Sequence, residues 1–218
     1  DDTRHPLRVT RHGHVRYSDT GPAHVLRQHR QGVSVASDGK YLYIGARMDD
    51  RQPSLIIPGE KIRDVTLANS DYVAFIFDTY HDHQNGFVFA TTPAGIEYDG
   101  QVIREGEGGG ANVPGQNRMQ GGAMGGFNVN WDASWAVATT VDSLGWSAEF
   151  RIPYSTLRYQ SANGEQTWGL NVSRMIRRKN EELYWSFIPR QFNLYRLSLA
   201  GNLAELTLPV RRIQTVTP

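Results

Sequence analysis

A stretch of strict apolar and polar alternation near the middle of the chain limits what this sequence can fold into. Between Trp146 and Ile152 every second residue is apolar, and the residues between them are serine, glutamate and arginine. A period of two residues is that of a β-strand with one face in a core and the other face in water. Pro153 follows at once, and the strand is expected to end there because proline cannot donate a ladder hydrogen bond.

Short runs of this kind, bounded by Gly, Pro, Asn and Asp, recur along the 218 residues, whereas helical periodicity is nearly absent. Residues 33–36 and 41–48 predict a hairpin around Asp38-Gly39, a favoured turn pair. Residues 72–78 are apolar on both faces, as in a central strand. We therefore expect one all-β domain, an antiparallel two-layer β-sandwich of the jelly-roll type with about ten strands. The other predicted strands are residues 86–91, 134–141, 146–152, 167–176, 183–188 and a final segment through 197–208.

The expected sandwich spans residues 32–208, and three segments of the chain are not part of its strands. Residues 1–31 form a basic arm with five of the seven histidines, and residues 209–218 form a C-terminal tail. Residues 104–126 hold nine glycines and few large apolar side chains, so they predict a long loop that cannot bury enough surface to order itself. A loop of this length is either flexible or ordered by a partner, and both readings stay open.

The composition excludes several kinds of chemistry. The chain has no cysteine, which rules out disulfides, thiolate zinc sites, iron–sulfur clusters and cysteine nucleophiles. The formal net charge of +1 gives no electrostatic reason to expect nucleic acid as a partner. No run of about eighteen apolar residues is present, so no transmembrane helix is expected. The chain starts at Asp1 without a methionine, from which we expect a processed protein exported to the periplasm or cell envelope.

Several motifs, taken in order, resemble those of the carbohydrate-binding module family 9-like domain. The resemblance covers roughly residues 32–206 and is closest to the type found ahead of an outer-membrane-type barrel of unassigned function in Gram-negative bacteria. It implies a β-sandwich, an exported location and no catalysis. In the family, xylanase-linked members bind sugars between aromatic rings and hold structural calcium, and a wider set with the same fold includes haem b domains. The matching motifs are residues 41–50, 70–79, 86–89, 93–95, 130–135, 145–158, 167–171, 174–178 with Glu181 and Trp185, and 199–203.

The chain departs from that family at its start. Family members usually open with an Asp-Gly-x-Leu-Asp-Glu-x-x-Trp element that forms an edge strand and supplies an aromatic ring. Residues 1–31 contain no such element and no tryptophan. This departure indicates a different sheet edge and leaves room for a different function.

A sugar platform needs an exposed flat ring, because the C–H faces of pyranoses pack on aromatic surface. Trp146, Trp168 and Trp185 share the parity of aliphatic neighbours and are predicted to lie in the core. Trp131 lies just ahead of a predicted strand and is the best exposed candidate. The predicted ligand-binding residues are Trp131, Tyr80 and Tyr98 as stacking rings, with Asp78 and Asn130 as partners of sugar hydroxyls.

Metal sites are suggested by aspartates and by one histidine pair. Asp49, Asp82 and Asp99 sit at predicted strand ends or turns, where calcium finds oxygen ligands, and calcium is the one cofactor considered. Their spacing matches no strict calcium loop, and turn-forming aspartates give the same pattern. His81 and His83 could bind zinc or copper with a distant third ligand, or belong to a solvated turn. His12 and His14 raise the same alternatives and also suit a basic arm.

A partner-binding surface is suggested by basic residues near position 175. The run from Arg174 to Lys179 is typical of a solvated hairpin end, and it could also face an acidic partner or anionic lipid headgroups. Arg174 has the parity of core residues, so its charge needs a partner, for which Glu149 is the candidate. The predicted partner-binding residues are Arg174, Arg177 and Arg178, with Met119 and Met124 of the glycine-rich segment.

Enzyme motifs such as Gly-x-Ser-x-Gly, a P-loop or His-Glu-x-x-His are missing. We therefore expect no enzyme but a non-catalytic binding module of the bacterial envelope, with a glycan as ligand. The alternative is an extrinsic docking subunit of a larger membrane-protein complex, which the replaced N-terminal edge and the glycine-rich segment favour. A minor alternative is a haem b electron-transfer domain, whose axial methionine would come from residues such as Met48 or Met175.

Overall fold

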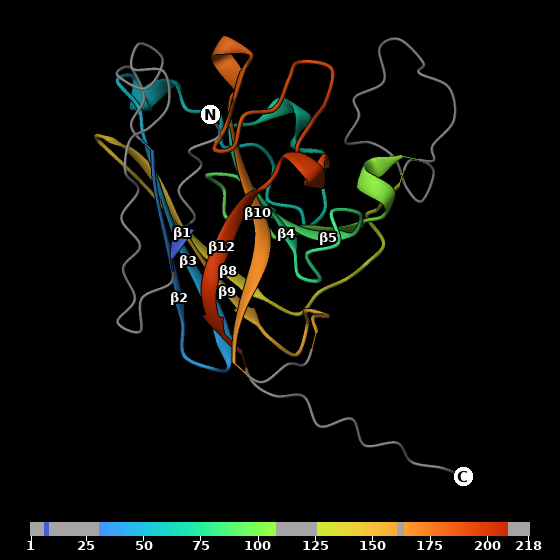
Figure 1. The fold of residues 1–218 in the computed structure, drawn as a ribbon. Helices are drawn as coiled ribbons and strands as arrows, with labels where there is room; N and C mark the ends of the chain where they lie inside the picture. The colour runs from blue at the N-terminus through green and yellow to red at the C-terminus, as the bar shows by residue number, and fades with distance from the viewer. Residues whose placement is uncertain (1–6, 9–30, 108–125, 161–163, 209–218) are drawn as a thin grey trace.

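The computed structural model describes residues 7–8, 31–107, 126–160 and 164–208. These residues form two β-sheets packed face to face, which confirms the predicted two-layer sandwich (Figure 1). The larger sheet has eight strands in the order β1-β12-β10-β4-β5-β6-β7, with β11 beside β10, and the smaller sheet has four in the order β2-β3-β9-β8. Among the described strands only the pairing of β1 with β12 is parallel.

Most strand bounds agree with the alternation read from the sequence. The larger sheet consists of β1 (Leu7–Arg8), β4 (Tyr72–Asp78), β5 (Gly86–Thr91), β6 (Tyr98–Val102), β7 (Phe127–Asn128), β10 (Glu165–Ile176), β11 (Glu181–Tyr184) and β12 (Gly201–Thr207). The smaller sheet consists of β2 (Gln31–Ser37), β3 (Tyr41–Asp49), β8 (Ala136–Asp142) and β9 (Gly145–Pro153).

Helical structure in the described part is restricted to single 3-10 turns, each of three residues. None of these helices is long and apolar enough to span a membrane. They are η1 (Pro53–Leu55), η2 (Leu67–Asn69), η3 (Arg104–Gly106), η4 (Arg177–Lys179) and η5 (Leu197–Leu199).

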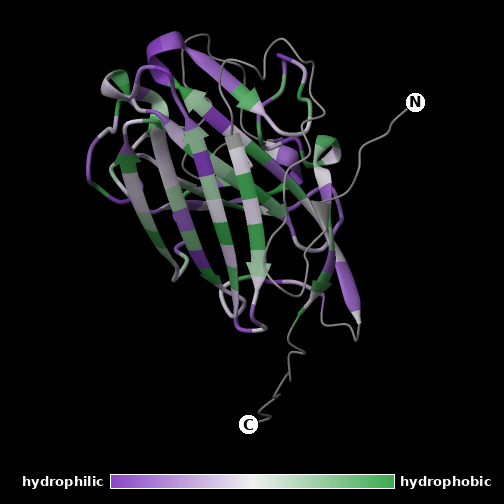
Figure 2. Ribbon diagram, turned by 90° about the vertical axis from the view of Figure 1, so that its left-hand side faces the viewer, coloured by the Kyte–Doolittle hydropathy of each residue, from purple (hydrophilic) through white to green (hydrophobic). Residues whose placement is uncertain are grey.

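The space between the two sheets is filled by the residues whose period-two spacing predicted it. In β9 Trp146 and Phe150 are 1% exposed, whereas Glu149 between them is exposed. The same alternation can be followed along the strands of the smaller sheet in Figure 2. From the larger sheet Phe75 meets Phe150 edge-on, with ring centroids 5.1 Å apart. Burial of such rings supplies most of the free energy that holds the sheets together.

A second apolar cluster covers the other face of the larger sheet. Tyr72, Ala74 and Ile76 of β4 point away from the first core and pack under the η2 turn and the segment that ends in η5. β4 is therefore buried on both faces, as its continuous apolar run predicted. This second layer places the segment after β11 against the sheet, where the candidate site lies.

The glycine-rich segment begins and ends at one place on the fold. The backbone N–H of Ile103 donates to the carbonyl of Gly126 at 2.7 Å, and a side chain at Gly126 would collide with Gly106, 2.5 Å away. A glycine at position 126, with φ at +69°, is therefore required for the two ends to meet. Residues 108–125, the arm before residue 31 apart from β1, and the tail after Leu208 lie outside the described residues.

Candidate functional site

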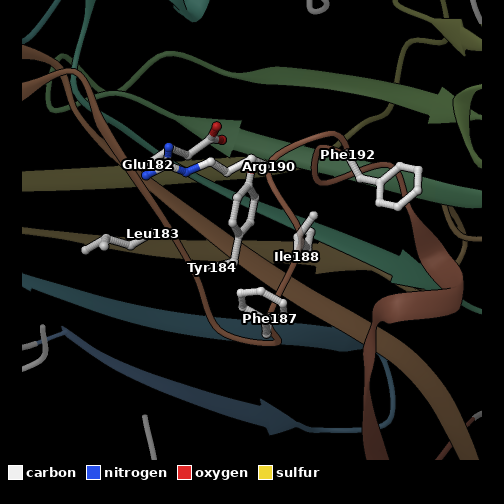
Figure 3. A pocket seen from close by; sticks show the side chains of 7 residues that line it. All are labelled: Glu182, Leu183, Tyr184, Phe187, Ile188, Arg190 and Phe192. Atoms are coloured by element: carbon white, nitrogen blue, oxygen red, sulfur yellow. The ribbon is translucent and has the colours of Figure 1, made fainter. Parts of the chain in front are cut away.

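A shallow pocket of about 370 Å³ lies on the outer side of the larger sheet, where β11 leads into the covering segment (Figure 3). β11 pairs with the end of β10, and Tyr184 packs against the second apolar cluster. The pocket is therefore supported from below by the sheet and on one side by residues that follow β11. It is lined by Glu182, Leu183, Tyr184, Phe187, Ile188, Arg190 and Phe192.

Three aromatic rings give the pocket its apolar surface. Phe187 is 80% exposed, the most exposed of the large apolar side chains in the described part of the chain. Tyr184 and Phe192 are half-buried, and the guanidinium of Arg196 lies 4.7 Å from the centre of the Phe192 ring. Such a cation over an aromatic face stabilises the ring's position. The exposed ring of Phe187 has a face available to the apolar side of a ligand.

Glu182 is the anchored polar group of the pocket. The hydroxyl of Tyr72 donates to Glu182 Oε1 at 2.8 Å, and the hydroxyl of Tyr184 also bonds to this carboxylate. Burial, and after it the charge of Glu182, raises the pKa of both tyrosines, so both remain protonated donors. The carboxylate is thus held in one orientation, with its remaining lone pairs available to a ligand.

Arg190 supplies the opposite charge. Its side chain is exposed, and no described residue forms an ion pair with it, Glu182 included. The pocket therefore presents an acceptor-only group and a donor-only group as separate charges. A ligand hydroxyl can donate to the first and accept from the second, while the rings contact its C–H groups. The arrangement suits a small polyhydroxylated molecule better than an ion of either sign.

The residues predicted from the sequence to bind a ligand lie elsewhere and do not form one site. Trp131 is half-buried, with its ring 4.8 Å from that of Phe87 and 6.0 Å from that of Phe89, on the inner side of the larger sheet. Tyr98 is 2% exposed in the outer cluster, where its ring stacks on Phe127. A buried ring has no free face for a sugar, so the expectation for Tyr98 does not hold.

Asp78 is also buried, because it builds a turn. Its carboxylate accepts the backbone N–H groups of Asp82 at 3.1 Å and His83 at 2.7 Å. It lies on the outer face of β4, opposite to the face that Trp131 covers, so one sugar cannot contact both. Tyr80 and Asn130 are exposed, and no described contact joins them.

The three candidate calcium ligands lie on different elements and already have partners. Asp49 accepts Arg47 Nε at 2.8 Å, and Asp82 accepts the backbone N–H groups of Gln84 and Asn85. Asp99 is 1% exposed and bonds to Trp135, Ala133 and Arg63. Within the described ranges no three His, Asp or Glu side chains converge as metal ligands.

The basic residues proposed for a partner are mostly turned inward. Arg174 is 1% exposed and donates from Nη2 to the backbone carbonyl of Asp49 at 2.9 Å. Burial lowers its pKa to about 10, against the opposing effect of nearby carboxylates such as Asp50. The prediction that Glu149 pairs with Arg174 is wrong, because Glu149 lies on the outer face of β9. Arg178 pairs with Asp50.

The remaining residues predicted to bind a partner or a haem are a hairpin arginine, a buried methionine and two methionines outside the described residues. Arg177 bonds through Nη1 to Asn180 at 2.9 Å, at the hairpin end that was predicted. Met48 is 1% exposed inside the first core, which leaves its sulfur inaccessible to a haem. Met119 and Met124 lie outside the described residues.

The pocket residues from 182 to 192 were not foreseen. The run from Leu183 to Ile188 alternates, and its large residues were assigned to the core on parity alone. Trp185 does pack against the first core, yet Phe187 faces solvent. Pro189 follows this run, but it gives no signal that the strand ends already at Tyr184.

No protein-family model and no curated protein matches this chain. Among solved structures, a candidate carbohydrate-binding protein from Bacteroides uniformis is similar with a TM-score of 0.58 and 13% identity, over 81% of this chain and 78% of that one. A family 9 carbohydrate-binding module from Caldicellulosiruptor kristjanssonii, solved with glucose, gives a TM-score of 0.55 and 12% identity, over 98% of this chain and 100% of the other. The chain therefore has the β-sandwich fold of the family 9 carbohydrate-binding modules, as its sequence motifs implied.

Proposed function

We propose that the protein is a non-catalytic carbohydrate-binding module whose ligand occupies the pocket beside β11. The observation that carries this proposal is the exposed ring of Phe187 in the same pocket as the anchored carboxylate of Glu182. Stacking rings with a few fixed polar groups are the usual composition of a sugar site. The fold shared with family 9 modules supports the assignment, although fold by itself does not determine function.

The charges of the pocket favour an uncharged sugar. Glu182 and Arg190 balance each other in charge, so the pocket has no net attraction for an acidic or an amino sugar, whereas neutral hydroxyls can donate to Glu182 and accept from Arg190. The pocket lies near the lower end of the usual size range for small-molecule sites, about 300–1,000 Å³. We therefore propose one or two residues of a neutral glycan as the bound unit.

We place the module in the bacterial envelope, as an exported protein. A periplasmic location is compatible with the lack of cysteine and with the glycans that such a module would meet. An extrinsic docking subunit with the same fold remains the competing proposal. It would bury Phe187 against a protein partner instead of a sugar.

Replacing Phe187 with alanine is expected to weaken sugar binding about tenfold, or about 1.4 kcal/mol, through loss of the stacking surface. The sugar is first identified on a glycan array, and its affinity is then measured by isothermal titration calorimetry. Leu144→Ala is the matched control, because Leu144 is also exposed, at 67%, but lies in the β8–β9 hairpin. Tyr80→Ala tests the site expected from the sequence. Loss of affinity in Tyr80→Ala but not in Phe187→Ala would reject the pocket, and a blank array would favour the docking subunit.

Replacing Tyr72 with phenylalanine is expected to lower the affinity without removing any ligand contact. Tyr72 is 3% exposed and reaches the pocket only through its bond to Glu182. A carboxylate held by Tyr184 alone is less well ordered, and ordering it on binding costs up to about 0.5–1.5 kcal/mol, or roughly two- to tenfold in affinity. Titration calorimetry measures the change, and unchanged affinity would show that Glu182 does not contact the sugar.

A further inference from the structure

The turn between β4 and β5 holds two histidine rings at a fixed separation. The ring centroids of His81 and His83 lie 4.9 Å apart, and both side chains are exposed. Both residues have left-handed backbone conformations, with φ of 54° and 57°. The buried carboxylate of Asp78 holds this turn by accepting the backbone N–H groups of Asp82 and His83. The rings are thus arranged before any ligand arrives.

Each ring directs one nitrogen to an oxygen of another residue. His81 Nε2 lies 3.1 Å from Asn202 Oδ1 in β12, and His83 Nδ1 lies 3.7 Å from the carboxylate oxygen Oδ2 of Asp78. At 3.1 Å the amide oxygen of Asn202 takes the N–H of His81, which leaves the lone pair on Nδ1, whereas His83 Nδ1 and Asp78 Oδ2 are too far apart for a direct hydrogen bond. Histidines that bind metals show this arrangement, with the second nitrogen donating to a carboxylate or carbonyl. No described residue bonds to Nδ1 of His81 or Nε2 of His83.

The separation of the rings fits shared coordination of one ion. With a metal–nitrogen distance of about 2.0–2.1 Å, each ring centre lies roughly 3.2 Å from the metal, and a tetrahedral angle then places the centres about 5 Å apart. The observed 4.9 Å agrees with this value.

We propose that His81 and His83 form an open site for a divalent transition-metal ion, zinc or copper. Imidazole nitrogen suits these ions and not calcium or magnesium, which take oxygen ligands. No third His, Asp or Glu of the described part joins the pair as a ligand, so water fills the remaining positions. Asp78 and Asn202 act as positioning residues, and the site is separate from the pocket beside β11.

The test is a zinc titration of the full chain without an affinity tag, followed by calorimetry at pH 7.5. His81→Ala and His83→Ala are each expected to weaken zinc binding at least tenfold. The double variant His12→Ala/His14→Ala is the matched control, because it removes two other histidines with the same spacing. Equal zinc affinity in the wild type and in a His81→Ala/His83→Ala variant would overturn the proposal, as would loss of binding in the control alone.

Asn202→Ala separates a metal site from a merely structural turn. Loss of an outer partner typically lowers metal affinity by about 10- to 100-fold, while the exposed side chain of Asn202 can be shortened without opening the core. Thermal unfolding with EDTA present is expected to be unchanged in this variant. Zinc affinity that is the same in Asn202→Ala and in the wild type would contradict the proposed site.

Discussion

Asp50→Ala is expected to lower the free energy of unfolding by about 3–5 kcal/mol, the cost of breaking a buried ion pair from one side. The Asp50 carboxylate is fully buried and accepts two bonds from Arg178, at 2.6 and 2.7 Å, and one from the backbone N–H of Gln52 at 2.8 Å. It is also the charge that most favours the protonated form of the buried Arg174. The variant would leave the guanidinium groups of Arg174 and Arg178 with too few hydrogen-bond acceptors.

The neighbouring aspartate provides the control for this prediction. The Asp49 side chain is 42% exposed and pairs with Arg47 at 2.8 Å, so Asp49→Ala should cost at most about 1 kcal/mol. Urea unfolding followed by tryptophan fluorescence gives both values. A loss in Asp50→Ala no larger than that in Asp49→Ala would show that solvent reaches the buried pair.

The pattern of apolar and polar residues was sufficient to predict several strands. The hairpin of β2 and β3, the two-sided burial of β4 and the bounds of β5 were confirmed, because local burial alone determines these patterns. β6 was missed because Asp99 and Gly100 favour turns in sequence. Gly100 is needed there for another reason, since a side chain would lie 2.3 Å from the Phe127 ring.

The end of β11 could not be read from the sequence, because a side chain replaces the backbone ladder there. The amide of Asn171 in β10 donates to the carbonyl of Ser186 at 3.1 Å and accepts the N–H of Ser186 at 2.8 Å. The chain after Tyr184 therefore leaves the strand and exposes Phe187. This long-range contact between Asn171 and Ser186 creates the pocket. The periodicity of the local sequence does not predict it.

The candidate ligand residues were misplaced for a related reason. Trp131 was expected to be exposed because it lies just ahead of a predicted strand, and Tyr98 was expected to stack on a sugar. Their burial depends on Phe87, Phe89 and Phe127 from distant parts of the chain. The acidic residues could be recognised as turn formers, yet their partners could not. Arg63, which supplies the charge next to Asp99, is 36 residues away in sequence.

Asp99→Ala is expected to destabilise the fold by about 3–5 kcal/mol, because three donors lose a common acceptor. The carboxylate accepts Trp135 Nε1 at 3.0 Å, the backbone N–H of Ala133 at 2.8 Å and Arg63 Nη2 at 2.6 Å. Burial raises the pKa of Asp99, and these bonds act against that effect. The indole and amide N–H groups would remain buried without partners, which costs about 1–3 kcal/mol each.

Asp132 is the matched control, since it accepts from the same nitrogen of Arg63 at 2.6 Å but its side chain is 80% exposed. Asp132→Ala should therefore cost at most about 1 kcal/mol in urea unfolding. The same experiment tests Asp99 as a calcium ligand, because the guanidinium of Arg63 already occupies the position next to the carboxylate that a cation would take. EDTA should leave the unfolding of the wild type unchanged. A loss of stability in EDTA that matches the effect of Asp99→Ala would instead assign a calcium ion to this carboxylate.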